Sequence, residues 1–418
     1  MSLSRRQLLS IPAAAIGPLA GMAPEKLSIR DIRVTILSFR LPPKNVWRTS
    51  AFEVWKTDCV IVEVETDQGI TGIGEPSPYG GPAEIKHYID TEIRPLLLGK
   101  NPFDVEDLCG SWMASARGPR VAWAGVDVAL WDIIARSKGK PLCEVLATGK
   151  PERRLRMYAS GGVEYAWYQR PEDLIDEGLR YKQQGYTAFK FRIGTEWKNS
   201  GMTIARYVPW IRRLRQAVGP DFDLMQEGNM RWTVDEALEL CPVLEELKIL
   251  WLEEPVPQQP KGAIDQYLRI NQALPTVKVS GGEQLGTRHE FKEWIDRGAY
   301  DIVQPDTNTA GITEAWHVAR TAHLHGRLCC PHNWHGGLTT AANAQLVAAI
   351  PNRLMLELNQ TFNPFKEEIF EEPLIVERGY LTVPNRPGLG VKLRAGLEAK
   401  FPFIPGPYAR PNSDLPKV

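Results

Sequence analysis

Five apolar, strand-like segments between residues 221 and 335 each end on polar or ionisable side chains, and their regular spacing constrains the fold more than any other feature. They read DFDLMQEGN, ILWLEEPVP, VKVSGGEQL, DIVQPDTN and RLCCPHNWH. Intervals of 26, 30, 23 and 26 positions separate the ionisable residues, which are Glu227, Glu253 (or its neighbour Glu254), Glu283, Asp306 and His332. Each interval holds about one strand and one crossover helix, so each residue occupies the same place in successive βα units.

The three glutamate positions predict a metal site. Carboxylates at the carboxyl ends of neighbouring parallel strands lie close together, where their unpaired charges would repel each other. A single glutamate at a strand end is usually solvated or ion-paired, but three in the same register indicate a shared partner. A divalent cation with oxygen ligands satisfies all three, so we expect it to bind Glu227, Glu283 and either Glu253 or Glu254.

The same spacing extends in both directions and favours a barrel. LRMYASGG and TAFKFRIG precede the five segments and RLMLELNQ follows them, which makes eight strand candidates. Helical patterns separate them, and one begins with a capping-box pair, Thr233 and Glu236. A doubly wound sheet also alternates strand and helix, but eight regular units favour an α/β fold with a TIM-type (β/α)7-8 barrel. Active sites of such barrels lie at the carboxyl ends of the strands.

The flanking sequence predicts an α+β capping domain. Residues 27–66 alternate as strands do, a DQG turn leads into ITGIGEPSPYGG, and helical patterns follow. After the eighth strand, LIVERGYLTVPNRPGLGVKL has a strand–turn–strand pattern and is expected to pack on the amino-terminal sheet. Loops near 42–51 and 75–81 are expected over the barrel mouth, where a lid would exclude water. The expected division is a capping domain at 27–150, a barrel at 151–372 and a return to the cap at 373–418.

Charge and cysteine content exclude several classes of protein. Lysine plus arginine equals aspartate plus glutamate at 50 each, so no global field favours nucleic acid or an anionic membrane. The six cysteines are irregularly spaced and predict buried free thiols rather than a disulfide framework. We therefore expect a small-molecule carboxylate as partner, no nucleic acid, no membrane span, and assembly as a homo-oligomer.

Residues 1–26 predict an export signal. The arginine pair Arg5 and Arg6 precedes a short apolar run of small residues, and GMA offers a cleavage site. This order is typical of a twin-arginine signal, which directs folded proteins to the periplasm. The apolar run contains two prolines and is too short for a transmembrane helix. A cytoplasmic protein with an unstructured amino terminus is the alternative.

From about residue 27 onward the chain resembles the enolase superfamily, in its mandelate racemase and muconate-lactonizing branch. No single motif is specific, but their order and spacing together are. The motifs are KFR at 190–192, EGN at 227–229, WLEEP at 251–255, GEQ at 282–284, QPD at 304–306, PHN at 331–333, LE at 356–357 and PGLG at 387–390.

The resemblance implies the metal chemistry. It selects Glu253 rather than Glu254 to join Glu227 and Glu283 around one Mg²⁺. Family substrates are carboxylates whose α-proton is removed, giving an enediolate that the metal stabilises. Glu357 corresponds to a residue that, when protonated, donates to the other carboxylate oxygen. The chain departs from the family at Glu227, where the usual first ligand is aspartate.

The acid–base residues are expected on strands two, six and seven. Lys190 and Arg192 are two apart on one strand and face the same side. The usual family motif is Lys-x-Lys, and an arginine, which stays protonated, disfavours a two-base racemase. His332 is the expected base, oriented by Asp306, and Lys190 is the alternative base. His335 has no strand-end position and is expected at the surface or in packing. The candidate substrate-binding residues are Asn229, Asn308 and Asn333.

Three functions follow from these residues. The first is a lyase that dehydrates an acid sugar, an aldonate or aldarate, to a 2-keto-3-deoxy acid. The second is a racemase, epimerase or cycloisomerase of a small carboxylic acid, which needs groups on both faces of the substrate or a different pocket. The third is a barrel that binds metal and acid without catalysis, which the set of ionisable residues argues against.

Overall fold

The computed structural model describes residues 26–48, 52–113, 120–163, 170–192, 202–259 and 261–411. The arginine pair and apolar run of the expected export signal lie outside these residues. Among the residues that are described, no helix combines the length and apolar character needed to cross a bilayer.

The amino-terminal part contains the expected antiparallel sheet. Strands β1 (Ile29–Arg40), β4 (Lys56–Thr66) and β5 (Thr71–Gly74) pair in the order β1-β4-β5. A tight turn joins β4 to β5, in which Gly69 adopts a φ of 78° that favours glycine. The backbone N–H of Thr66 donates to the carbonyl of Ile70 at 2.9 Å and closes this turn. The sheet prediction is therefore confirmed.

Helix α4 (Arg120–Ser137) is buried on all sides because it lies between this sheet and helix α11 (Thr307–Leu324). The close approach needs glycine in β5. A Cβ on Gly72 would lie 2.0 Å from the carbonyl oxygen of Ala129 in α4, so no larger residue fits there. The other helices of this region are α1 (Pro82–Tyr88), α2 (Arg94–Leu97), α3 (Val105–Met113) and α5 (Leu142–Leu146).

Eight parallel strands form the second part, and all eight predicted strand segments are confirmed. Neighbours in the chain pair in parallel from β6 to β12, and β13 pairs in parallel with β6. In the described residues, the last link, between β12 and the chain before β13, is one isolated parallel bridge from Cys329 to Arg353. The strands are β6 (Arg154–Gly161), β7 (Ala188–Arg192), β8 (Asp223–Glu227), β9 (Trp251–Glu253), β10 (Lys278–Gly281), β11 (Ile302–Val303), β12 (Leu328–Cys329) and β13 (Leu356–Asn359).

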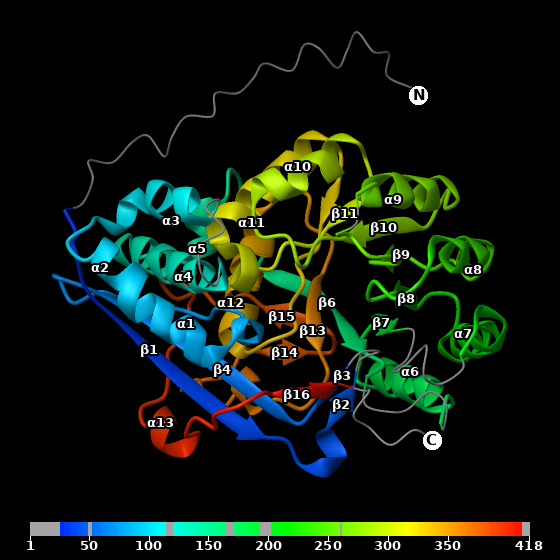
Figure 1. Cartoon of the computed structure of the whole chain (residues 1–418), viewed down its shortest axis with the longest axis horizontal. Coiled ribbons are helices and arrows are strands. Elements are labelled where there is room, and N and C mark those ends of the chain that lie inside the picture. Colours follow the sequence, from blue (N-terminus) through cyan, green and yellow to red (C-terminus); the bar gives the residue numbers. More distant parts are fainter. Residues whose placement is uncertain are drawn as a thin grey trace, which may run out of the picture.

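A helix follows each of the first seven strands, on the outside of the strands (Figure 1). The predicted capping box is confirmed: the Thr233 hydroxyl accepts from the N–H of Glu236 at 3.2 Å, and the Glu236 carboxylate accepts from the N–H of Thr233 at 2.8 Å. These helices are α6 (Asp173–Gln183), α7 (Ile204–Val218), α8 (Val234–Glu246), α9 (Ala263–Gln272), α10 (Arg288–Asp296), α11 and α12 (Gly337–Ala349).

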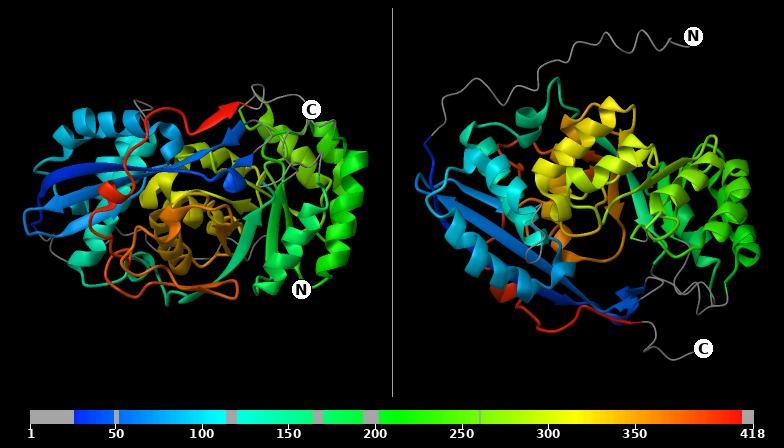
Figure 2. Two further views of the ribbon diagram at one scale, coloured as in Figure 1. Left: turned by 90° about the horizontal axis from the view of Figure 1, so that it is seen from below. Right: turned by 45° about the horizontal axis from the view of Figure 1, so that its top comes forward.

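The carboxyl-terminal segment corrects one prediction. The strand–turn–strand pattern is present as β14 (Val376–Glu377) and β15 (Tyr380–Thr382), but β15 pairs antiparallel with the first residues of β6. These first residues of β6 precede the residues that pair with β7 and β13. Their edge would otherwise be open, and the hairpin covers it. The chain reaches the amino-terminal part only later, through the bridge from Gly388 to Pro141 and through strand β16 (Ala409–Pro411). Figure 2 shows this last strand beside the amino-terminal strands. A short helix, α13 (Leu397–Lys400), lies between Gly388 and β16 in the chain.

The cysteine prediction is also confirmed. All six thiols are free and buried, so packing accounts for them. Burial raises the pKa of each, Cys241 to about 12. These thiols are therefore uncharged at neutral pH and poor nucleophiles.

Candidate active site

The site is one layer of polar side chains above an apolar floor, both contributed by the parallel strands. Seven floor residues come from seven strands or their direct continuations, and they form one buried cluster: Tyr158, Ala188, Met225, Trp251, Ile302, Cys330 and Met355. Side chains two positions further along a strand point to the same side. That step leads to the buried polar layer, which consists of Ser160, Lys190, Glu227, Glu253, Gln304, His332 and Glu357.

Three carboxylates in and beside this layer form a candidate cation site. One oxygen from each of Glu227, Glu253 and Glu283 lies within 4.8 Å of the others. Glu254 points away, since its carboxylate accepts from the Gln258 amide at 2.6 Å and from the backbone N–H of Gly282 at 3.2 Å. Periodicity left Glu253 and Glu254 open, and the structure places Glu253 in the cluster.

The electrostatics of the cluster fit a hard cation. Burial and the charge of Glu227 raise the pKa of Glu253 to about 8. Burial opposes ionisation of Glu227 too, yet Lys190 and Arg192 lower its pKa to about 2. Oε2 of Glu227 lies 3.1 Å from the Lys190 ammonium, and Oε2 of Glu283 lies 3.3 Å from His332 Nε2, so cationic groups already surround the cluster. Crowded anionic oxygens of this kind are the ligands that Mg²⁺ and Ca²⁺ prefer.

Lys190 lies at the centre of the layer. Its fully buried ammonium bonds Glu253 and is 3.1 Å from both Glu227 Oε2 and Glu357 Oε1. Burial alone would lower the pKa of Lys190, but these three carboxylates outweigh it and raise the pKa well above its ordinary value. Lys190 is therefore a cation in this arrangement, which favours electrostatic stabilisation over base catalysis.

Arg192 borders the cavity above the layer. One terminal nitrogen is 3.8 Å from Glu227 Oε2, and the guanidinium lies 4.5 Å from the centre of the Trp334 ring. Its Nε is buried and has no hydrogen-bond partner in the described residues. A guanidinium that lies over an aromatic ring and has an unused N–H donor is suited to bind an anionic or hydroxylated ligand.

His332 and Asp306 form the expected pair. Nδ1 of His332 is 2.6 Å from Oδ2 of Asp306, and Nε2 is 3.3 Å from Oε2 of Glu283. Burial would lower the pKa of His332, but Glu283 and the hydrogen bond to Asp306 raise it to about 10. Asp306 is fully buried and also caps helix α11, because its Oδ1 accepts from the backbone N–H of Asn308 at 3.1 Å. Nε2 thus faces the carboxylate cluster in a fixed orientation.

The charge of Glu357 depends on its neighbours. Its Oε2 accepts from the backbone N–H of Asn333 at 2.7 Å, and its Oε1 is 3.1 Å from the Lys190 ammonium. Burial favours the neutral acid, but Lys190 and His332 lower the pKa of Glu357 to about 2. This arrangement therefore favours an ionised Glu357, because two neighbouring cationic groups stabilise the carboxylate, and the donor role that the resemblance implies stays a prediction.

The three asparagines are placed differently. Asn229 is half-buried and borders the cavity, so its assignment to substrate binding stays a prediction. Asn308 is fully buried, and its amide donates to the Thr339 hydroxyl at 3.4 Å. Asn333 is also buried and donates to the carbonyl of Glu357 at 2.8 Å. The side chains of Asn308 and Asn333 are therefore buried and hydrogen-bonded to other protein groups, so they are poorly placed to bind a ligand.

A cavity of about 530 Å³ lies above the polar layer, which is ample for a six-carbon acid. Glu283, His332 and Arg192 border it together with a wall of aromatic side chains, of which Trp334 contacts Arg192 and His335 lies beside His332. Both loops expected over the mouth contribute described residues to this aromatic wall. Its aromatic members are Trp47, Phe52, Tyr79, Trp334, His335 and Tyr408.

Three groups at the site were not anticipated. Gln304 donates to Glu253 Oε2 at 2.7 Å, and its position two residues after Ile302 could have indicated this. The Glu75 carboxylate, from the amino-terminal part, accepts from the backbone N–H of Thr339 at 2.9 Å in the first turn of α12, which no sequence signal predicts. His335 is buried, as its expected packing alternative allows, but it also borders the cavity, which was not anticipated. Burial lowers the pKa of His335 to about 4, so it is neutral.

Together these features define a two-part α/β protein whose parallel-strand domain carries a carboxylate cation site beside an Asp–His pair. The chain belongs to the enolase superfamily. It matches the mandelate racemase / muconate lactonizing enzyme amino-terminal domain over residues 32–147 and the enolase C-terminal domain-like family over residues 173–397.

Acid-sugar enzymes are among the relatives. The chain is 32% identical to the arabinonate dehydratase of Saccharolobus solfataricus over 82% of this chain and 90% of the relative. It is 30% identical to the D-galactarolactone cycloisomerase of Agrobacterium fabrum, over 90% and 99%. A solved enolase-superfamily structure from Polaromonas sp. JS666 superposes with a TM-score of 0.81 at 32% identity, over 91% of this chain and 99% of that one. Members of this superfamily are characterised by an amino-terminal cap and a TIM-type barrel. The enzymes among these relatives support the conclusion that this chain is an enzyme.

Proposed function

We propose that this chain is a Mg²⁺-dependent lyase that removes the α-proton of an acid sugar and eliminates its β-hydroxyl, giving a 2-keto-3-deoxy acid. The observation that carries the proposal is the position of the His332–Asp306 pair beside the cluster of Glu227, Glu253 and Glu283. Nε2 of His332 lies 3.3 Å from Oε2 of Glu283. The dehydratase relatives support the same reaction class.

The roles follow from the contacts. Mg²⁺ held by Glu227, Glu253 and Glu283 would polarise the substrate carboxylate and make its α-proton more acidic. An ionised Asp306 can only accept, so Nδ1 of His332 carries the proton and Nε2 is the lone-pair nitrogen. His332 Nε2 takes the α-proton and then returns a proton to the departing β-hydroxyl, which leaves as water. Once Glu283 shares its charge with a cation, it raises the pKa of His332 less, which suits a base.

Lys190 supports this reaction by charge. Its ammonium lies among Glu227, Glu253 and Glu357, and it stabilises the negative charge that develops on the substrate carboxylate. Arg192 provides a second cation at the cavity, which we assign to substrate binding. We also propose a homo-oligomer and, from Arg5 and Arg6, export to the periplasm.

A cycloisomerase is the second candidate function, favoured by the 30% identical galactarolactone cycloisomerase. It shares α-proton removal with the dehydratase but yields an isomer of its substrate, whereas dehydration releases water. A racemase would need a second base opposite His332, and Lys190, as a buried cation, is poorly suited to that role.

The test is a screen of aldonates, aldarates and their lactones with the purified protein and Mg²⁺. Formation of 2-keto acid, detected as a semicarbazone, together with loss of the substrate α-proton in the NMR spectrum, supports the lyase. Isomerisation without release of water supports the cycloisomerase. Absence of both turnover and α-proton exchange for every acid would refute the proposal.

A further inference from the structure

A second small sheet joins the two ends of the chain at the cavity. Strand β16 pairs antiparallel with β3 (Phe52–Val54), which pairs with β2 (Trp47–Arg48), in the order β16-β3-β2. The register places Ala409 beside Val54 and Arg410 beside Glu53. Trp47 and Phe52 from this sheet, and Tyr408 directly before β16, border the same cavity as His332. The carboxyl-terminal segment is therefore part of the wall of the site.

Buried charges hold this sheet together. Glu53 in the middle strand is 5% exposed, and its two oxygens bind arginines from both neighbouring strands. Arg48 donates to Oε2 at 2.5 Å, and Arg410 donates to Oε1 through Nε at 3.0 Å and a terminal nitrogen at 2.7 Å. A buried carboxylate is costly without such partners, so β16 and β2 are needed together.

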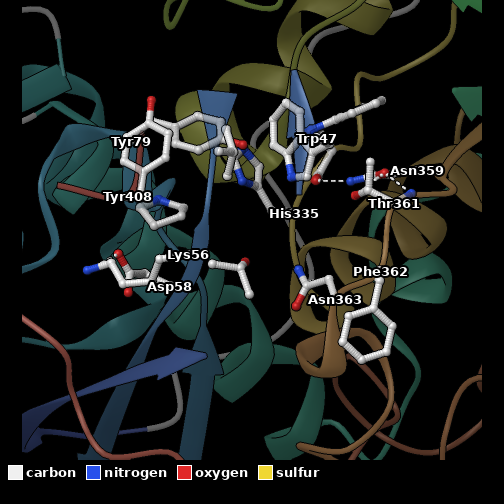
Figure 3. A pocket seen from close by; sticks show the side chains of 14 residues that line it. Trp47, Lys56, Asp58, Tyr79, His335, Asn359, Thr361, Phe362, Asn363 and Tyr408 are labelled. Atoms are coloured by element: carbon white, nitrogen blue, oxygen red, sulfur yellow. Dashed lines mark hydrogen bonds and ion pairs between the residues drawn. The ribbon is translucent and has the colours of Figure 1, made fainter. Parts of the chain in front are cut away.

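A fully buried lysine fixes the chain just before β16. The Lys56 ammonium donates to the carbonyls of Ile404 at 2.6 Å and Gly406 at 3.0 Å, and it is 3.1 Å from Oδ2 of Asp58. These three acceptors match the three donors of an ammonium. Figure 3 shows Lys56 and Asp58 close to Tyr408. The segment 404–406 is thus held on strand β4 by one side chain.

Backbone contacts then set the position of Tyr408. Its carbonyl accepts from the backbone N–H groups of Trp55 at 3.1 Å and Lys56 at 3.2 Å. Its ring stacks on Tyr79, with centroids 4.8 Å apart and planes at 29°. The Tyr79 ring is in turn 4.8 Å from that of His335. Tyr408 therefore stands in a series of rings that leads away from His332 along the cavity.

We propose that Tyr408 is a specificity-determining residue that contacts the end of the acid-sugar substrate distant from its carboxylate, and that Lys56 is the latch that positions it. This inference rests on the proposed function for the identity of the substrate. If the carboxylate of the substrate binds near Glu283, the rest of the substrate extends along the cavity toward Tyr408. Because Tyr79 and His335 separate Tyr408 from His332 in the series of rings, we expect a six-carbon acid to reach Tyr408 and a three-carbon acid to stop short of it, so chain length distinguishes this contact from a role near the metal site.

The first test is Tyr408→Ala, assayed with Mg²⁺ on the six-carbon acid that the wild-type chain turns over fastest and on glycerate as a three-carbon acid. We expect the KM for the six-carbon acid to rise about tenfold, as for loss of an aromatic contact, with kcat within about twofold. The KM or Kd for glycerate stays unchanged. Tyr380→Ala, on the antiparallel edge of β6 at the amino ends of the strands, is the control and changes neither value.

The second test is Lys56→Met, with Lys44→Met at an exposed position as control. We expect hydrogen exchange of residues 404–411 and of the amides of Trp55 and Lys56 to accelerate at least tenfold, with a KM change like that of Tyr408→Ala. If Lys56→Met fails to fold, Lys56→Gln, which keeps an amide donor but loses the charge and one of the three donors, should accelerate the same exchange relative to Lys44→Gln.

Two kinetic results would overturn the inference: an equal rise in KM for both acids, or no change for the six-carbon acid. Unchanged exchange in Lys56→Met would overturn the latch. If the wild-type chain neither binds nor turns over any acid, the proposed function fails and the substrate contact with it. The exchange experiment needs no substrate, so it decides the latch in that case as well.

Discussion

Replacing Asp306 by asparagine gives the sharpest test of the acid–base pair, because the structure dictates how the new amide is oriented. Oδ1 of Asp306 accepts from the backbone N–H of Asn308 at 3.1 Å, and Oδ2 faces Nδ1 of His332 at 2.6 Å. The asparagine oxygen keeps the first position, since an NH₂ group there would oppose a backbone donor. The NH₂ group then faces His332 and donates to Nδ1, which moves the imidazole proton to Nε2. Nε2, the nitrogen that faces the carboxylate cluster and is the proposed base, can then no longer accept a proton.

The expected loss is large and confined to the chemical step. A general base contributes roughly 10²–10⁴-fold, so we expect kcat and the rate of α-proton exchange to fall by about that factor, or about 3–5 kcal/mol in activation free energy. Asparagine is as good an N-cap as aspartate, so the free energy of unfolding should change by less than about 1 kcal/mol. Mg²⁺ affinity, measured by calorimetry, should be retained because Asp306 is not a ligand.

The matched control is Asp127→Asn, at another buried aspartate that contacts helix α11. Asp127 accepts from the backbone N–H of Thr313 at 3.0 Å and lies outside the polar layer. It should lower stability without lowering kcat. A loss of less than tenfold in proton exchange for Asp306→Asn would refute the assignment of His332 as base, as would an equal loss in the control.

Four further predictions follow from the site. Glu253→Gln should abolish turnover and weaken Mg²⁺ binding, and exhaustive chelation should do the same in the wild type; full turnover after chelation would contradict the metal site. Arg192→Lys should raise KM at least tenfold with little change in kcat, while new epimerisation in this variant would indicate a second base. Since His335 has a folded-state pKa of about 4 against an ordinary 6.5, the unfolded chain binds more protons between these values. Stability is then complete above pH 6.5 and falls by about 2 kcal/mol at pH 5, and urea unfolding of His335→Gln should show a smaller loss. Replacing Arg5 and Arg6 by lysine should retain the protein in the cytoplasm, and an intact amino terminus on protein isolated from the periplasm would argue against a cleaved signal.

The spacing of polar strand ends was enough to predict the parallel strands and most of the polar layer. One strand plus one crossover helix takes a nearly constant length of chain, so Glu227, Glu283 and either Glu253 or Glu254 could be placed together before any coordinates were known. The same periodicity led to His332 and Asp306, which lie 2.6 Å apart. Local patterns of this kind depend only on the geometry of strands and helices, which the sequence encodes residue by residue.

Protonation states and contacts between distant segments were decided only by the tertiary structure. The resemblance implies a donor role for Glu357 when it is protonated, but its charge depends on how close Lys190 and His332 come, and distances between side chains on different strands cannot be read from spacing. Likewise no pattern in the sequence links Tyr408 to Lys56, because their contact joins residues 352 positions apart through backbone carbonyls that every residue possesses. A sequence pattern predicts which side chains lie on each face of a strand. The residues that those side chains contact depend on the tertiary fold of the whole chain.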